Sequence, residues 1–428
     1  MAITILDLPF EVLILVSQQI EAFHDKVNFA RSHPKLWNVF AYHHRKNVQN
    51  EITFTNNEEF KYMITHFDFI LEWWGSSVIS IKNPYNYVES GDLLEMAAKF
   101  CPNLKYIQFV IHEDNLRKVE QCVSKCEMLN KIELRIEYPF NWNYTPENYY
   151  HVDKVIKSLQ SLTNLRYINF GSHALKKDER TKLNDMVQLD ELQIGPIQAD
   201  EVDDLASLLG HLTVLRIEYY PDTKTLSKLA KYCGNLQKLC LEDYDNRSFM
   251  EKFSTTWRIP YFPKLTYLHI FKGSSANPFL YHLDSRFNNQ LKVLNIPCLT
   301  MGKQEIKRVG EFKVLKELFC REIQPNSIDV LVKMPLERIH WNSKELSDIH
   351  VLRLVKESTS LTSMRCSIRN LNKKFFCDFL DILERKGFQA DRPFSLNILF
   401  VENDDRKKNL IVEFTSIPNS NLMSLTLI

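Results

Sequence analysis

Cysteine and histidine are the residue types whose spacing in this sequence first suggests chemistry. Cys122 and Cys126 form a C-x-x-x-C pair, and His43 and His44 are adjacent. Structural zinc sites are built from closer cysteine pairs that occur twice, and this pair has no second half. Adjacent residues on a helix point about 100° apart, so the two histidines do not face one metal ion. We therefore predict that the chain has no metal site.

Motifs of common catalytic sites are missing from the sequence. There is no G-x-S-x-G, no H-E-x-x-H, no P-loop and no G-x-G-x-x-G, and the chain has only 10 glycines. These motifs supply a nucleophile, a metal pair or a phosphate cradle. We predict no catalytic residues, no cofactor and no enzyme activity of the chain's own.

The composition limits which binding partners and which cellular compartment we expect for this chain. The 428 residues include 54 Lys+Arg and 53 Asp+Glu, which gives a net charge of +1 and argues against nucleic acid as a partner. The 9 cysteines form no short disulfide framework, so we expect a cytoplasmic and/or nuclear protein. The apolar run 12–16 is too short to span a bilayer, and the segment 6–20 lacks the basic region and cleavage site of a signal peptide. We expect no membrane association.

Internal repetition is the strongest pattern in the chain. The motif L-x-x-L-x-L, with other apolar residues allowed, recurs mostly at the spacing of about 20–29 residues that is typical of leucine-rich repeats. Two short segments, 52–54 and 79–81, look like degenerate members of the series. The first leucines of the clear repeats are Leu104, Leu129, Leu165, Leu189, Leu212, Leu236, Leu265, Leu291, Leu315, Leu336 and Leu361, with looser copies at Leu396 and Leu422.

The segments between these motifs predict helices, because their apolar residues recur at three- and four-residue steps. Such stretches are 152–162, 201–212, 226–233 and 375–387. A strand followed by a helix cannot bury its own apolar face, but stacked copies form one continuous core. We expect parallel strands on a concave face and helices on a convex face. Longer connections are expected at 137–150, 243–262 and 271–290, and a charged loop at 401–409.

The N-terminal segment predicts three short helices. Pro9 suits the first turn of a helix and Glu11 complements its positive end, and the following run 12–16 makes this helix apolar nearly all round. A second helix is expected over 25–31, and a third begins at Pro34. A bundle this small has a thin core, so the surplus apolar surface of the first helix indicates a partner.

Two families are similar to the two halves of this sequence. The segments "KFCPNLKYIQF" and "KYCGNLQKLCL" match the C-x-x-L-x-x-L-x-L pattern of cysteine-containing leucine-rich repeats, a resemblance that covers about residues 80–428. Cys101, Cys126 and Cys233 share this register, and we interpret them as small buried residues. The N-terminal segment resembles the F-box, with a good Leu-Pro-x-Glu start, whereas Ser32 and His33 stand where that family often has Cys and Arg.

The resemblance implies an α/β architecture: an N-terminal three-helix F-box-like module at 1–48, followed by a leucine-rich-repeat solenoid at 49–428. The solenoid would hold about 12–14 irregular repeats, with 49–100 degenerate. It also implies the substrate-recognition subunit of an SCF-type ubiquitin ligase, which docks on a Skp-family adaptor and through it on a cullin–RING ligase. The residues expected to contact the adaptor are Leu8, Pro9, Val12, Leu13, Val16, Ile20 and Trp37.

The third and fifth positions of each motif alternate with the buried leucines and should line the concave face. Tyrosine and arginine are favoured anchors at interfaces. We therefore expect a protein substrate, whose identity the sequence does not give, to contact Tyr267, Phe319, Arg338, His340 and Arg365.

Two other functions are compatible with the same residues. One is a leucine-rich-repeat interaction scaffold outside any ligase, in which the first helix would be buried against its own repeats. The other is a sensor with a small ligand on the concave face, which a ring of basic residues would favour.

Overall fold

A computed structural model of the chain describes residues 4–21, 23–47, 50–53, 66–83, 90–136, 152–243, 257–272, 280, 282–342, 346–368, 371–399 and 404–428. These residues form two compact units. Unit 1 contains 1–195 and 204–208, and unit 2 contains 196–203 and 209–428. The predicted connection 137–150, the start of the segment 401–409, Phe54 and parts of the connections 243–262 and 271–290 lie outside the described residues.

Unit 1 begins with three helices and continues with alternating strands and helices. Its helices are α1 (Phe10–Gln19), α2 (Phe23–Arg31), α3 (Pro34–Asn47), α5 (Phe67–Trp74), α6 (Ser90–Phe100), α7 (Leu116–Val123), α8 (Asp153–Leu159) and α9 (Lys177–Asn184). Its strands are β1 (Glu51–Thr53), β2 (Ser80–Lys82), β3 (Tyr106–Ile111), β4 (Lys131–Ile136), β5 (Tyr167–Asn169) and β6 (Glu191–Ile194).

Unit 2 repeats the same alternation. Its strands are β7 (Val214–Glu218), β8 (Lys238–Asp243), β9 (Tyr267–Lys272), β10 (Val293–Met301), β11 (Glu317–Ile323), β12 (Arg338–His340), β13 (Ser363–Cys366), β14 (Phe394–Ile398) and β15 (Met423–Leu427). Its helices include α11 (Thr223–Tyr232), α13 (Lys303–Val309), α14 (Ile328–Leu331), α15 (Asp348–Glu357), α16 (Lys373–Arg385) and α17 (Asp404–Thr415). Helix α10 (Ala206–His211) precedes β7.

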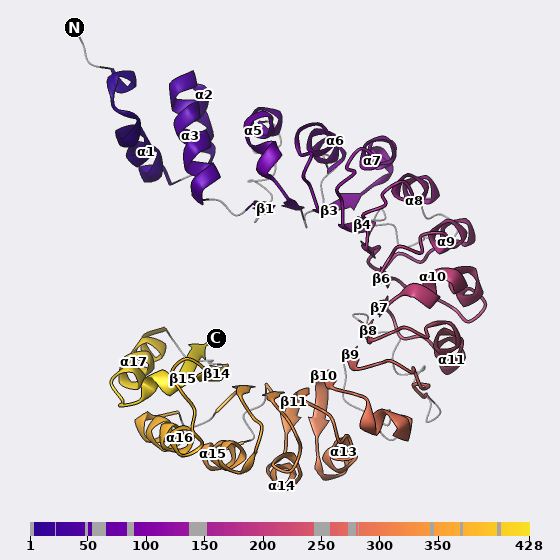
Figure 1. Cartoon of the computed structure of the whole chain (residues 1–428), viewed down its shortest axis with the longest axis vertical. Coiled ribbons are helices and arrows are strands. Elements are labelled where there is room, and N and C mark those ends of the chain that lie inside the picture. The colour runs from indigo at the N-terminus through magenta and orange to yellow at the C-terminus, as the bar shows by residue number, and fades with distance from the viewer. Residues whose placement is uncertain are drawn as a thin grey trace. The chain divides into compact units, whose positions relative to one another are not determined.

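The strands within each unit are parallel and pair in chain order, which confirms the predicted α/β repeat. In unit 1, Ile107 pairs with Ile132, Ile132 with Ile168, and Ile168 with Leu192. The corresponding row of unit 2 runs from Leu215 on β7 to Leu425 on β15 without a slip. In each unit the helices lie on one side of the strand layer (Figure 1). Each unit is therefore a stack of leucine-rich-repeat type, whose buried leucines fill the space between the two layers.

The helix expectations are confirmed, with three differences. The segment 201–212 forms a 3-10 helix at Val202–Leu205 and then α10. Between β9 and β10 the segment 271–290, expected as a long connection, contains a 3-10 helix at Ser285–Asn289. The expectation of a charged loop at 401–409 was wrong from Asp404 onward, because α17 begins there. Leu410 and Phe414 of this helix are buried, so these two apolar residues four apart anchor a turn rich in charge.

The three cysteines that share the repeat register are buried, as predicted. Burial raises the pKa of the Cys101, Cys126 and Cys233 thiols to about 12. A thiol with such a pKa carries almost no thiolate at neutral pH, which is the reactive form. These residues therefore act as small core side chains.

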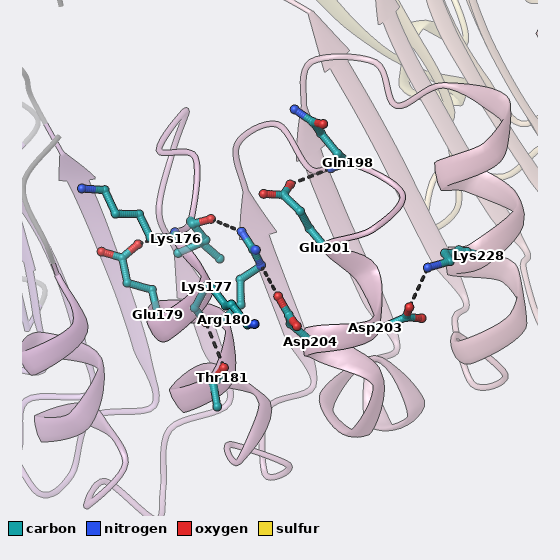
Figure 2. Close-up of polar contacts among 11 residues, drawn as sticks. Lys176, Lys177, Glu179, Arg180, Thr181, Gln198, Glu201, Asp203, Asp204 and Lys228 are labelled. Carbon is teal, nitrogen blue, oxygen red and sulfur yellow. Dashed lines mark hydrogen bonds and ion pairs between the residues drawn. The ribbon is translucent and has the colours of Figure 1, made fainter. Parts of the chain in front are cut away.

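A buried polar cluster lies at the start of α9 in unit 1. The Glu179 carboxylate accepts hydrogen bonds from His173 Nε2 at 2.9 Å and from the backbone N–H groups of Val152 and Lys176, each at 2.8 Å. Arg180, the next residue, donates from Nε to Asp204 Oδ2 at 2.9 Å, and Figure 2 shows the two side chains pointing toward each other. These three hydrogen bonds connect the segment before α8 with α9. In each of them the Glu179 carboxylate is the acceptor.

Candidate protein-binding surfaces

Two pairs of hydrogen bonds fix the chain where it enters α1. Asp7 Oδ2 accepts from the Thr4 backbone N–H at 2.7 Å, and this hydrogen bond and a second one from the Thr4 hydroxyl hold the pKa of Asp7 below its usual value. Lys35 Nζ, from α3, donates to the carbonyl oxygens of Leu6 and Leu8 at 2.6 and 2.9 Å. These carbonyls precede the helix and have no partner within it, so Lys35 attaches the start of α1 to α3.

Helix α1 has two different apolar faces. Its inner face contains Leu13, which is fully buried with Leu36 and Val39 of α3, and the flanking Phe10 and Ile14 are partly buried on the same cluster. Phe10 also packs edge-on against Tyr42, with ring centroids 5.5 Å apart. The residues of this inner face follow the three- and four-residue steps of a helix.

The outer face of α1 presents apolar side chains to solvent. Leu15 is 59% exposed and Val12 is 37% exposed, and Ile5 in the turn before the helix is 43% exposed. We call Val12 and Leu15 the outer stripe. Isolated exposed leucines are common, but Val12 and Leu15 are one helical turn apart and therefore adjoin on the surface.

The adaptor-binding residues expected from the sequence divide into three groups by burial. Pro9 and Val12 are exposed, and Leu8, Val16 and Ile20 are half-buried. Leu13 and Trp37 are buried inside unit 1, so their side chains hold the helices together and do not line the outer surface. The Trp37 ring lies against Phe69 of α5, with centroids 4.4 Å apart, and thereby attaches α3 to the first repeat helix.

Leu15 and Ile5 are the surface residues that the sequence analysis missed. Leu15 lies three residues after Val12, and this spacing on a helix could have indicated a shared face. The F-box pattern does not include position 15 among its expected adaptor contacts. Ile5 precedes the helix, where no periodicity applies.

The strand face of unit 2 forms the second candidate surface. The fifth positions of successive motifs are register partners, so they form one row across the sheet: Arg216, Cys240, His269, Asn295, Phe319, His340, Arg365 and Asn397. This confirms that they share a register. Cys240 was expected to be exposed, but its side chain is buried. Its Sγ lies 3.7 Å from Nη1 of Arg216.

Four of the five expected substrate-binding residues lie together on β11–β13. The Phe319 and His340 rings pack edge-on with centroids 5.6 Å apart, and Arg365 is the register partner of His340. Arg338 forms an ion pair with Glu317. Two effects lower the pKa of His340 below its ordinary value. Burial is the larger effect, and the positive charge of Arg365 is the second.

Tyr267 lies apart from these four residues, on β9. The Lys238 ammonium lies over its ring, 4.3 Å from the ring centroid. Its hydroxyl oxygen accepts a hydrogen bond from Asn295 Nδ2 at 3.3 Å. Burial raises the pKa of this phenol. Because β9 is two strands from β11, about 10 Å of sheet separates Tyr267 from the cluster around Phe319.

Among the described residues, no group of three or more His, Cys, Asp or Glu side chains could hold a metal ion. Within the same residues, no helix has the length and apolar character needed to cross a bilayer. The side chains of His43 and His44 lie outside the described part of the chain.

Comparisons with known proteins give little more. No family model matches the chain, and no curated protein matches it. Among solved structures, the match titled "Crystal structure of TLR13-ssRNA13 complex" aligns over 76% of this chain at 14% identity, with a TM-score of 0.33. The alignment spans 56% of that protein's length. The repeat motif and the strand register described above define the leucine-rich-repeat architecture of each unit.

Proposed function

We propose that this chain is the substrate-recognition subunit of an SCF-type ubiquitin ligase, in which α1 docks on a Skp-family adaptor and the repeats bind a protein substrate. The observation that carries the proposal is the outer stripe of α1. A helix that packed only to complete its own bundle would place polar residues at Val12 and Leu15, whereas these apolar side chains face solvent.

The position of α1 in unit 1 supports an outward role. Trp37 of α3 packs on Phe69 of α5, and α1 packs on α3 through Leu13, Leu36 and Val39. Figure 1 shows α3 between α1 and α5. The interaction scaffold outside a ligase predicts a first helix buried on its own repeats, and an outer stripe that is exposed favours the docking role over that alternative.

The chain would position the substrate and would supply no reactive group. Holding a substrate beside a ubiquitin-conjugating enzyme raises the effective concentration of the target lysine, without any new catalytic residue. This role agrees with buried, high-pKa cysteines in the repeat register. Localisation in the cytoplasm or nucleus follows from the same proposal.

The test is affinity purification of the full chain from cells, with mass spectrometry of the proteins recovered. The double substitution Val12→Asp/Leu15→Asp should abolish recovery of adaptor and cullin, because two carboxylates would have to be buried at the interface. Ile411→Asp/Val412→Asp, which places the same charges on exposed positions of α17, is the matched control and should recover both. Recovery of repeat-bound proteins without any adaptor from the wild-type chain would instead favour a scaffold outside a ligase.

A further inference from the structure

The strand face of unit 2 contains a row of three adjoining side chains with unequal chemistry. Phe319, His340 and Arg365 are successive register partners on β11, β12 and β13, so their Cα atoms are about 4.8 Å apart from strand to strand. All three alternate with buried residues of the core, namely Leu318, Ile339 and Met364. An edge-on aromatic pair, Phe319 and His340, therefore adjoins a guanidinium on one surface.

Arg338 and Arg365, two arginines of this region, are in different electrostatic states. Arg338 is neutralised by Glu317, its register partner on β11. Arg365 is exposed, and within the part of the chain that the structure describes no carboxylate forms an ion pair with it. Arg321 is a third arginine nearby, and its guanidinium donates to Thr300 Oγ1 at 2.9 Å. Arg365 is therefore an exposed positive charge beside the Phe319–His340 ring pair.

Small polar side chains surround Arg365 on the strands that follow. The third positions of β13, β14 and β15 are Ser363, Ser395 and Ser424, and the fifth positions of β14 and β15 are Asn397 and Thr426. Short side chains leave the longer guanidinium accessible from that direction. Their hydroxyl and amide groups are also hydrogen-bond donors for an oxyanion bound to Arg365.

We propose that the protein segment held by this face carries an acidic side chain that binds Arg365, beside an apolar side chain that packs on Phe319 and His340. A guanidinium presents paired donors that match the two oxygens of a carboxylate or phosphate group. The neighbouring rings exclude water from one side and so strengthen the charge interaction. The lowered pKa of His340 agrees with this arrangement, since burial and the Arg365 charge both disfavour its protonation.

The inference rests on the proposed substrate-binding role of the repeats, and it names the chemistry of the substrate. A nucleic acid is the less favoured polyanion, because the chain as a whole has a net charge of +1 and polyanion binding depends on many phosphate contacts. The observations therefore favour a single oxyanion next to an apolar group, which is a peptide feature.

The experiment selects short random peptides from a display library on the immobilised full-length chain. We expect Asp and Glu to be enriched in the recovered peptides. The most enriched acidic peptide is then synthesised, and its affinity is measured for the wild type and variants. Arg365→Glu should weaken binding about tenfold or more, because a charge-assisted pair is lost and a repulsive pair is formed.

Three controls make the result specific. Arg385→Glu reverses an exposed arginine at the end of α16 and should leave affinity unchanged. The charge-neutral pair Glu317→Gln/Arg338→Gln should change it less than Arg365→Glu does. Replacing the acidic residue of the peptide by lysine should restore binding to the Arg365→Glu variant, which a merely structural role of Arg365 would not do.

The source of the oxyanion is distinguished with two further peptides, which carry phosphoserine or serine at the acidic position. Tighter binding of the phosphoserine peptide identifies phosphate, and tighter binding of the acidic peptide identifies carboxylate. Equal binding of the serine peptide, no acidic enrichment, or no peptide recovered above the level on albumin would overturn the inference. Val12→Asp/Leu15→Asp should select the same peptides as the wild type, so adaptor docking and peptide binding can fail separately.

Discussion

Leu13 and Leu15 lie two residues apart on α1 and face opposite environments: the first is 0% exposed and the second 59% exposed. The helix thus separates a structural role from a surface role within one short apolar run. Leu13→Ala should lower the free energy of unfolding of the N-terminal helices by about 2–5 kcal/mol, because it leaves a cavity. Leu15→Ala should change it by less than about 0.5 kcal/mol.

Hydrogen–deuterium exchange of the α1–α3 amides measures this difference directly. We expect faster exchange throughout the three helices in Leu13→Ala and unchanged exchange in Leu15→Ala. Equal loss of protection in both variants would mean that Leu15 is also part of the packed core.

Glu179 should make unit 1 sensitive to acid. Burial alone would raise the pKa of this carboxyl, but the hydrogen bond and charge of His173 and the backbone N–H groups of Lys176 and Val152 outweigh burial and hold the pKa below 4.5. A lowered folded-state pKa stabilises the fold at pH values above 4.5, and this contribution is lost as the pH falls through the folded value.

Glu179→Gln removes that titration. Its unfolding free energy should be lower than that of the wild type at pH 7 and should depend less on pH below about pH 5. Glu201→Gln is the control, because the hydrogen bond that its carboxylate accepts from the Gln198 N–H lies at the surface, as Figure 2 shows. Urea titrations at several pH values provide the measurement, and parallel curves for wild type and Glu179→Gln would contradict the assignment.

Two glycines should respond in opposite directions to alanine. A Cβ on Gly75 would lie 2.3 Å from the Phe100 carbonyl oxygen, so Gly75→Ala should destabilise unit 1 by about 1–3 kcal/mol. A Cβ on Gly210, within α10, would have no neighbour closer than 4.0 Å, so Gly210→Ala should stabilise by about 0.5–1 kcal/mol. Thermal unfolding of both variants checks the signs.

Cysteine labelling should follow burial. In the native chain at pH 8, iodoacetamide should modify Cys298 and Cys377, which are partly exposed, before it modifies Cys101, Cys126 or Cys233. Peptide mapping by mass spectrometry reads the order, and unfolding in guanidinium should make all of them react. Early labelling of Cys233 in the folded chain would show that its corner of the repeat opens.

The repeat motif predicted more of this structure than any other feature. The spacing of Leu-x-x-Leu-x-Leu places Ile107, Ile132 and Ile168 in one row, because a strand side chain has only two faces and one of them must be buried. The same alternation predicted that Phe319, His340 and Arg365 share a row.

The exposure of α1 could not be predicted in the same way. Its run of large aliphatics shows that much of the helix needs cover, but the sequence does not tell which side α3 occupies. Lys35 settles this by binding the carbonyls of Leu6 and Leu8, a contact between segments nearly thirty residues apart. Such contacts leave no local periodicity. The start of α17 at Asp404 was missed for a related reason, since its turn rich in charge is anchored by only Leu410 and Phe414.

The most direct test of the central proposal is calorimetric titration of the purified full-length chain with a purified Skp-family adaptor. We expect saturable one-to-one binding to the wild type and to Ile411→Asp/Val412→Asp. We expect no measurable binding to Val12→Asp/Leu15→Asp, although its circular dichroism spectrum and melting temperature are unchanged. Binding of this variant with wild-type affinity, or no binding by the wild type, would contradict the docking role of α1.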